Sequence, residues 1–100
     1  MDCLLNCWYF CFFLSSQVAW IRFESRTILS AHDELVTQSR RYAIENKEQE
    51  SVDLMISNIG PEDNGTYICQ INSNPMKNLV SELHFVQDLG SGRKYVELYL

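Results

Sequence analysis

The sequence predicts an all-β fold in which two sheets pack face to face, and three observations support it. The run Asp63–Cys69 reads Asp-Asn-Gly-Thr-Tyr-Ile-Cys, so a tyrosine stands two residues before a cysteine. Upstream, Leu54 and Ile56 have the two-residue spacing of a strand with one buried face. Trp20 lies in the strand-like segment Val18–Arg22. A core tryptophan, combined with a tyrosine just before a cysteine, is typical of an immunoglobulin-like β-sandwich.

Turn residues divide the rest of the chain into short strands. Gly60-Pro61 and Asn64-Gly65 are strong turn dipeptides, and Asn74-Pro75 marks a hairpin. A short additional strand at the sheet edge would make the sandwich variable-type or intermediate-type. The expected strands are Val18–Arg22, Thr27–Ser30, Glu34–Thr37, Tyr42–Glu45, Val52–Ile56, Thr66–Asn72 and Val80–Val86.

Several residues are expected to stabilise this sandwich. Arg41 begins one strand and Asp63 precedes another, at positions where many such domains are closed by an ion pair. Gly65 belongs to the turn that precedes the tyrosine-bearing strand. Strand alternation places a further set of side chains in the core between the sheets. The expected core residues are Trp20, Leu54, Ile56, Tyr67 and Cys69.

Length, charge and motifs limit the classes of function. A chain of 100 residues suits one domain, and its net charge of -5 argues against a nucleic-acid surface, which needs clustered Lys and Arg. No apolar run reaches the roughly 20 residues of a membrane-spanning helix. Neither a nucleophile elbow nor a Gly-rich phosphate cradle is found. We therefore expect no enzyme, no catalytic residue, no metal, no cofactor and no small-molecule substrate.

The first 17 residues differ from the rest of the chain. Cys3, Cys7 and Cys11 recur every four residues there, and Trp8–Leu14 lacks the alternation of a half-exposed strand. Three interpretations compete for this segment. It is a secretory signal with Trp8–Leu14 as its apolar region, or a strand whose Cys7 stands at a suitable distance before Trp20, or translated intron sequence.

We favour the third interpretation. Phe10–Gln17 is what a pyrimidine-rich tract ending in a splice acceptor would encode, whereas a signal peptide would need a basic residue where Asp2 stands. We therefore expect residues 1–17 to lie outside the domain. Residues 18–87 would form a partial sandwich truncated at its first two strands, so that Cys69 lacks a disulfide partner, and residues 88–100 would form a flexible tail.

Two stretches carry a closer resemblance. Val18–Arg22 with Thr27–Ser30, and Tyr67–Lys77 with the sequence Tyr-Ile-Cys-Gln-Ile-Asn-Ser-Asn-Pro-Met-Lys, resemble the first immunoglobulin domain of lachesin and the Dpr-interacting proteins, neuronal adhesion proteins related to neurotrimin. The resemblance covers residues 18–86. It implies an extracellular recognition module at the plasma membrane of neurons, held there by a tether absent from this chain. It also implies homophilic or heterophilic pairing with other Ig-domain cell-surface proteins.

In proteins of this group the pairing surface is the sheet that carries the tryptophan and the second cysteine. Alternation from Trp20, Tyr67 and Cys69 sends their chain neighbours to the outer face of that sheet. An apolar stripe flanked by amides is suited to a small interface. The expected partner-binding residues are Ile21, Ile28, Ile68, Gln70, Asn72 and Met76. The alternative is a truncated product of such a gene that binds nothing.

The turn before the tyrosine strand also carries a modification motif. Asn64-Gly65-Thr66 is an N-glycosylation sequon, and turn residues are exposed. Glycosylation of Asn64 is expected if the chain is secreted.

Overall fold

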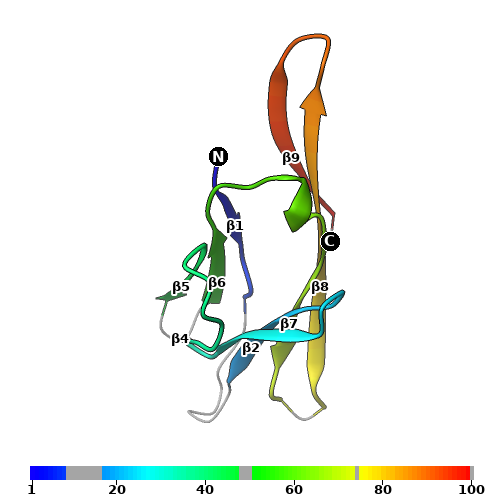
Figure 1. Cartoon of the computed structure of the whole chain (residues 1–100). Coiled ribbons are helices and arrows are strands. Elements are labelled where there is room, and N and C mark those ends of the chain that lie inside the picture. The colour runs from blue at the N-terminus through cyan, green and yellow to red at the C-terminus, as the bar shows by residue number, and fades with distance from the viewer. Residues whose placement is uncertain (9–16, 48–50, 74, 100) are drawn as a thin grey trace.

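The computed structural model describes residues 1–8, 17–47, 51–73 and 75–99, which form two antiparallel sheets (Figure 1). The elements are β1 (Cys3–Leu5), β2 (Val18–Arg22), β3 (Thr27–Ala31), β4 (Glu34–Leu35), β5 (Tyr42–Lys47), β6 (Ser51–Ile56), the 3-10 turn η1 (Pro61–Asp63), β7 (Gly65–Ile71), β8 (Lys77–Asp88) and β9 (Arg93–Tyr99). The smaller sheet has the strand order β1-β6-β5. The larger sheet has the order β4-β3-β2-β7-β8-β9.

The two sheets enclose one core, and Trp20 connects them. Its side chain is fully buried, and its indole Nε1 donates a hydrogen bond of 2.9 Å to the carbonyl oxygen of Val52 in the opposite sheet. β2, which carries Trp20, is paired on both sides, with β3 and with β7. The core expected from the sequence is confirmed, since all five residues are 1% exposed or less: Trp20, Leu54, Ile56, Tyr67 and Cys69.

The N-terminal residues belong to the sandwich, so the expectation that residues 1–17 lie outside it is wrong for residues 3–8. β1 pairs antiparallel with β6, from Cys3 opposite Ile56 to Leu5 opposite Leu54. The pairing continues along the chain, because the amide of Val52 donates to the carbonyl oxygen of Cys7 at 3.0 Å. The second strand of the immunoglobulin-like sandwich is therefore present. Residues 9–16, on which the translated-intron interpretation chiefly rests, lie outside the described residues.

Cys69 has a disulfide partner, which corrects the expectation that it has none. Cys7 and Cys69 are bonded across a sequence separation of 62 residues, with their Cα atoms 6.2 Å apart. Both are buried: Cys69 is paired with Trp20 in the larger sheet, and Cys7 follows β1 beside the smaller sheet. The signal for this strand lay in Cys3, Leu5 and Cys7, which are buried at alternate positions while the residues between them are more exposed.

The strands expected from the sequence are confirmed, with small shifts of their ends. The edge strand β4 pairs with β3, which gives the larger sheet the extra strands of a variable-type sandwich. The C-terminal segment, however, is not the expected flexible tail. β9 pairs with the second half of β8, and the two strands project beyond the sandwich as a hairpin (Figure 1).

The hairpin turn explains why this segment folds back. The amide of Gly92 donates to the carbonyl oxygen of Asp88 at 2.7 Å, and Gly92 adopts a φ of 72° that glycine tolerates well. Asp88 Oδ1 also accepts a hydrogen bond from the amide of Gly90, which lowers the pKa of Asp88. A Gly-containing loop between two alternating segments is the sequence signal of such a hairpin.

Candidate protein-binding face

Strand register brings four apolar side chains into one row on the outer face of the larger sheet. Ile21 of β2 is paired with Ile28 of β3 and with Ile68 of β7. Ile68 is in turn paired with Val80 of β8. Because paired residues of antiparallel strands point to the same face, these side chains adjoin one another. We call Ile28, Ile21, Ile68 and Val80 the isoleucine row.

The two ends of the isoleucine row are its most exposed members. Ile28 is 52% exposed and Val80 is 45% exposed, whereas Ile21 and Ile68 between them are partly buried. Val80 was missed by the sequence analysis. The signal that could have found it is the alternation of β8, in which Ser81 and Leu83 are buried and Val80 must therefore face outward.

A polar pair lies next to the isoleucine row. Gln70 is two residues from Ile68 on the same face, which corresponds to about 7 Å along the strand. Its Nε2 donates a hydrogen bond of 3.2 Å to Oδ1 of Asn78, its partner on β8. These amides are exposed or partly exposed and retain further hydrogen-bonding capacity. They can fix the register of a partner that covers the apolar row.

The other two expected binding residues lie at the end of the sheet. Asn72 follows the last residue of β7 and Met76 immediately precedes β8, so neither belongs to the ladder between these strands. Both are exposed, Met76 to 54%. The structure therefore groups Ile21, Ile28 and Ile68, places Gln70 beside them, and leaves Asn72 and Met76 at the margin.

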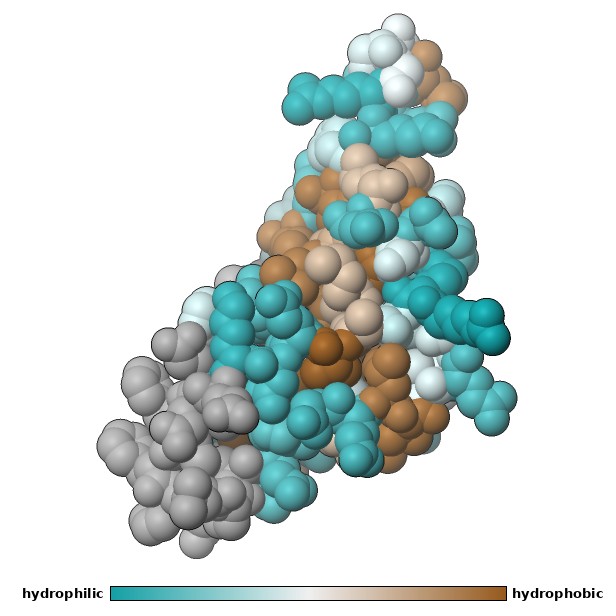
Figure 2. Space-filling model, turned by 90° about the vertical axis from the view of Figure 1, so that its left-hand side faces the viewer, coloured by the Kyte–Doolittle hydropathy of each residue, from teal (hydrophilic) through white to brown (hydrophobic). Residues whose placement is uncertain are grey.

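Exposed apolar atoms occur elsewhere on this molecule too. Figure 2 shows, on the side of the molecule in view, a band of apolar residues flanked by hydrophilic ones. Scattered surface apolar residues are normal in soluble proteins. The isoleucine row is distinguished from them by its register, because one apolar residue from each of four adjacent strands contributes to it.

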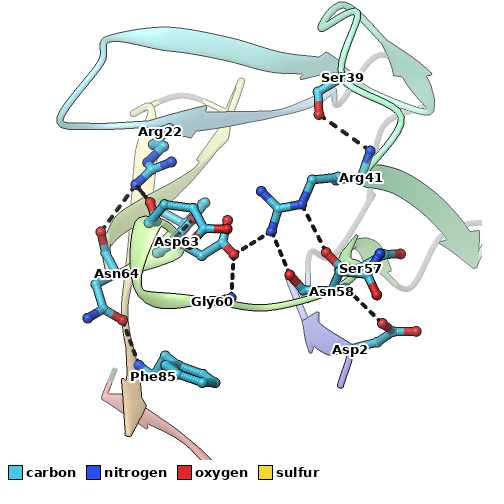
Figure 3. Close-up of polar contacts among 12 residues, drawn as sticks. Asp2, Arg22, Ser39, Arg41, Ser57, Asn58, Gly60, Asp63, Asn64 and Phe85 are labelled. Carbon is cyan, nitrogen blue, oxygen red and sulfur yellow. Dashed lines mark hydrogen bonds and ion pairs between the residues drawn. The ribbon is translucent and has the colours of Figure 1, made fainter. Parts of the chain in front are cut away.

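One end of the sandwich is held by the predicted ion pair between Arg41 and Asp63 (Figure 3). The guanidinium of Arg41 also donates to the carbonyl oxygens of Ser57 and Asn58, each at 3.1 Å. Asp63 is fully buried, and its hydrogen bond to Arg41 raises the pKa of the arginine. The charge of Asp63 is therefore compensated inside the fold, as a buried carboxylate requires.

The hydroxyl of Tyr67, on β7, makes a second contact at the same end of the sandwich. It donates a hydrogen bond of 2.9 Å to the backbone carbonyl oxygen of Asp63, which is the tyrosine corner of an immunoglobulin-like sandwich. Burial raises the pKa of Tyr67, so the hydroxyl stays protonated and remains a donor. These contacts fix β7, and with it the outward direction of Ile68.

Gly65 occupies a position that other residues fit poorly. Its φ of 151° is unfavourable for residues with a Cβ, and an added Cβ would collide with the carboxylate of Glu24. That carboxylate accepts hydrogen bonds of 2.9 Å from the amide of Thr66. We expect Gly65→Ala to lower the free energy of unfolding by about 1–3 kcal/mol, measured by urea denaturation. Glu24→Ala, combined with Gly65→Ala, tests the collision: equal losses with and without Glu24 would contradict it.

The described residues contain no helix long and apolar enough to span a membrane.

Comparison with known proteins identifies the family to which this fold belongs. The family profile "Immunoglobulin V-set domain" matches residues 2–87. Comparison with curated protein sequences finds no match. Among solved structures, a chain in "Crystal structure of Dpr1 IG1 bound to DIP-eta IG1" superposes with a TM-score of 0.72 at 34% identity, covering 79% of this chain and 74% of that chain.

Two further structures show the same fold. A chain in "Crystal structure of Dpr11 IG1 bound to DIP-gamma IG+IG2" has a TM-score of 0.73 and 26% identity, covering 88% of this chain and 49% of that chain. This chain thus spans about half of that one. The "RIG-5 IG1 homodimer" has a TM-score of 0.69 and 23% identity, covering 79% of this chain and 76% of that chain, and supports the fold alone.

These neighbours are binding or adhesion domains rather than enzymes, and such domains are typically extracellular or at the cell surface. The profile covers most of the chain and begins at residue 2, ahead of β1. The disulfide, the buried tryptophan and the tyrosine corner are the features of that fold. The chain belongs to the immunoglobulin V-set domain family.

Proposed function

We propose that this chain is an extracellular recognition domain of neuronal cell adhesion, which pairs with an Ig domain on another protein or another copy of itself. The outer face of β3, β2, β7 and β8 makes the contact. The observation that carries this proposal is the isoleucine row, which crosses four strands of one sheet. Apolar residues at the centre of an interface supply most of the affinity, and surrounding polar groups supply register.

The neighbours in known structures support this assignment. The chain that resembles this one at 34% identity was crystallised in a complex of Dpr1 IG1 with DIP-eta IG1, two Ig domains. At that identity the fold and its general mode of use are expected to be shared. The proposed partner is therefore an immunoglobulin domain of a cell-surface protein, and the pairing is homophilic or heterophilic.

The test is a charge placed at the centre of the row. We expect Ile68→Asp to weaken pairing at least about 30-fold, about 2 kcal/mol, because the carboxylate would be buried against the partner without a counter-charge. Binding is measured by surface plasmon resonance against a panel of first Ig domains of the Dpr and DIP kinds, and against the chain itself. Ala43→Asp is the matched control, because Ala43 is exposed on β5 in the opposite sheet.

The outcomes separate the two functional hypotheses. Loss of binding in Ile68→Asp, with Ala43→Asp unchanged, supports recognition through the isoleucine row. Equal binding of both variants contradicts the proposed face. A wild-type chain that is folded, with Cys7–Cys69 formed, and binds no domain of the panel favours the alternative of a non-binding gene product.

A further inference from the structure

The sequon residue Asn64 has a definite role in the fold. It follows η1 and precedes β7, with φ -57° and ψ 134°, and its side chain is exposed. Its carboxamide Oδ1 accepts a hydrogen bond of 2.6 Å from the amide of Phe85 on β8 (Figure 3). The last backbone pair between β7 and β8 is Gly65 opposite Leu83. The side chain of Asn64 therefore takes the place of the next backbone hydrogen bond between β7 and β8.

This contact leaves the two ends of the carboxamide in different environments. The oxygen is engaged by β8, while Figure 3 shows the nitrogen turned away from the strand. Within the described residues, no hydrogen bond from Nδ2 is seen. The amide nitrogen, which is the atom modified in N-glycosylation, is thus held on the surface while its neighbouring oxygen is fixed.

The disulfide supplies an independent observation about the compartment. Cys7 and Cys69 are bonded in the core, and such bonds form in the secretory lumen rather than in the cytosol. The lumen is also where chains with an Asn-x-Ser/Thr sequence meet the lipid-linked sugar donor. Asn64-Gly65-Thr66 meets that requirement, since Gly65 is the middle residue and Thr66 supplies the hydroxyl.

We propose that Asn64 carries an N-linked glycan in the secreted chain. The donor is an oligosaccharide joined through its first sugar carbon to a lipid diphosphate. Nδ2 of Asn64 forms a bond to that carbon and gives up one proton, while the carbon–oxygen bond to the diphosphate breaks. The lipid diphosphate leaves with the electron pair. This inference rests on the extracellular location contained in the proposed function.

The fold accommodates the product without rearrangement. A glycosylated asparagine keeps its carbonyl oxygen, so Oδ1 can still accept the hydrogen bond from Phe85. Asn64 is four residues before Ile68 along the chain, about 13 Å in an extended strand, which places the glycan to one side of the isoleucine row. The glycan would therefore mark one boundary of the binding face and leave the row itself uncovered.

The test uses the full chain with a cleavable secretory leader, produced in cells that attach N-glycans. We expect the secreted wild type to lose the mass of one glycan on treatment with a glycan-removing amidase, and peptide mapping to find aspartate at position 64. Thr66→Val should abolish this mass loss while keeping the Asn64–Phe85 hydrogen bond. Thr66→Ser should still show the mass loss. Asn64→Asp should abolish it and retain an oxygen acceptor for Phe85.

The glycan proposal would be overturned if the secreted chain contained the Cys7–Cys69 disulfide but an unmodified Asn64. A mass loss that persists in Thr66→Val would overturn it as well, because the sugar would then lie elsewhere. Partner binding is measured separately on refolded chain that has no glycan. A failure of the glycan proposal is thereby distinguished from a failure of the binding face.

Discussion

Trp20→Ala is expected to remove about 3–5 kcal/mol of the free energy of unfolding, a large fraction of the roughly 5–15 kcal/mol of a typical domain. The indole is fully buried between the sheets, so its truncation leaves a large cavity beside Cys69. The carbonyl oxygen of Val52 also loses its donor. The measurement is urea denaturation followed by far-ultraviolet circular dichroism, because removal of Trp20 also removes a fluorescent probe.

Trp20→Phe is the matched variant for this prediction. It retains an aromatic ring and loses the indole N–H, so its loss of stability should be smaller than that of Trp20→Ala. A loss below about 1 kcal/mol for Trp20→Ala, in a chain that still folds, would show that Trp20 is not the centre of the core.

Removing the disulfide with Cys7→Ala and Cys69→Ala together is expected to cost about 4 kcal/mol. The bond closes a loop with a sequence separation of 62 residues, and the chain-entropy estimate for a loop of that length gives this value. The same denaturation experiment measures the loss. Non-reducing peptide mapping of the wild type should recover Cys7 and Cys69 in one linked fragment.

Cys3→Ala is the control, because Cys3 is a buried free thiol on β1, four residues before Cys7. Its substitution removes one small buried group and leaves the cross-link, so its cost should be well below that of the double variant. A linked fragment that contains Cys3 and Cys69 instead would contradict the structure of the smaller sheet.

The sequence allowed the core and most strands to be predicted, because the motif around Tyr67 and Cys69 specifies both local turn chemistry and long-range packing. Asp63, Gly65 and Tyr67 each have a fixed position in that motif, and all three take the expected roles. The ion pair of Arg41 could be predicted for the same reason. These features follow from residue type and spacing alone.

The ends of the chain could not be predicted in the same way. The alternation of Cys3, Leu5 and Cys7 is short, and the four-residue spacing of the cysteines also fits one face of a helix. The neighbouring Trp8–Leu14 has no alternation, so the sequence pattern does not indicate a strand of the domain there. Only pairing with β6, a contact distant in sequence, identifies β1 as a strand.

The outer face was predictable in part. Alternation identified Ile21 and Ile68 as outward-facing, and the structure places them in register. Alternation along β8 also directs Val80 outward, but its place opposite Ile68 depends on the register between β7 and β8, which the length of their connection sets. Alternation directs Asn72 outward and the hairpin turn brings Met76 near, but both residues lie past the ends of the paired strands.

The isoleucine methyl groups offer the most direct measurement of the proposed binding face. In a chain labelled at these methyls, titration with an Ig domain that binds should shift or broaden the signals of Ile21, Ile28 and Ile68. The signals of Ile44 and Ile56, which belong to the opposite sheet, should stay unchanged. The reverse pattern, with Ile44 perturbed and Ile68 unaffected by a domain that binds, would contradict recognition through the isoleucine row.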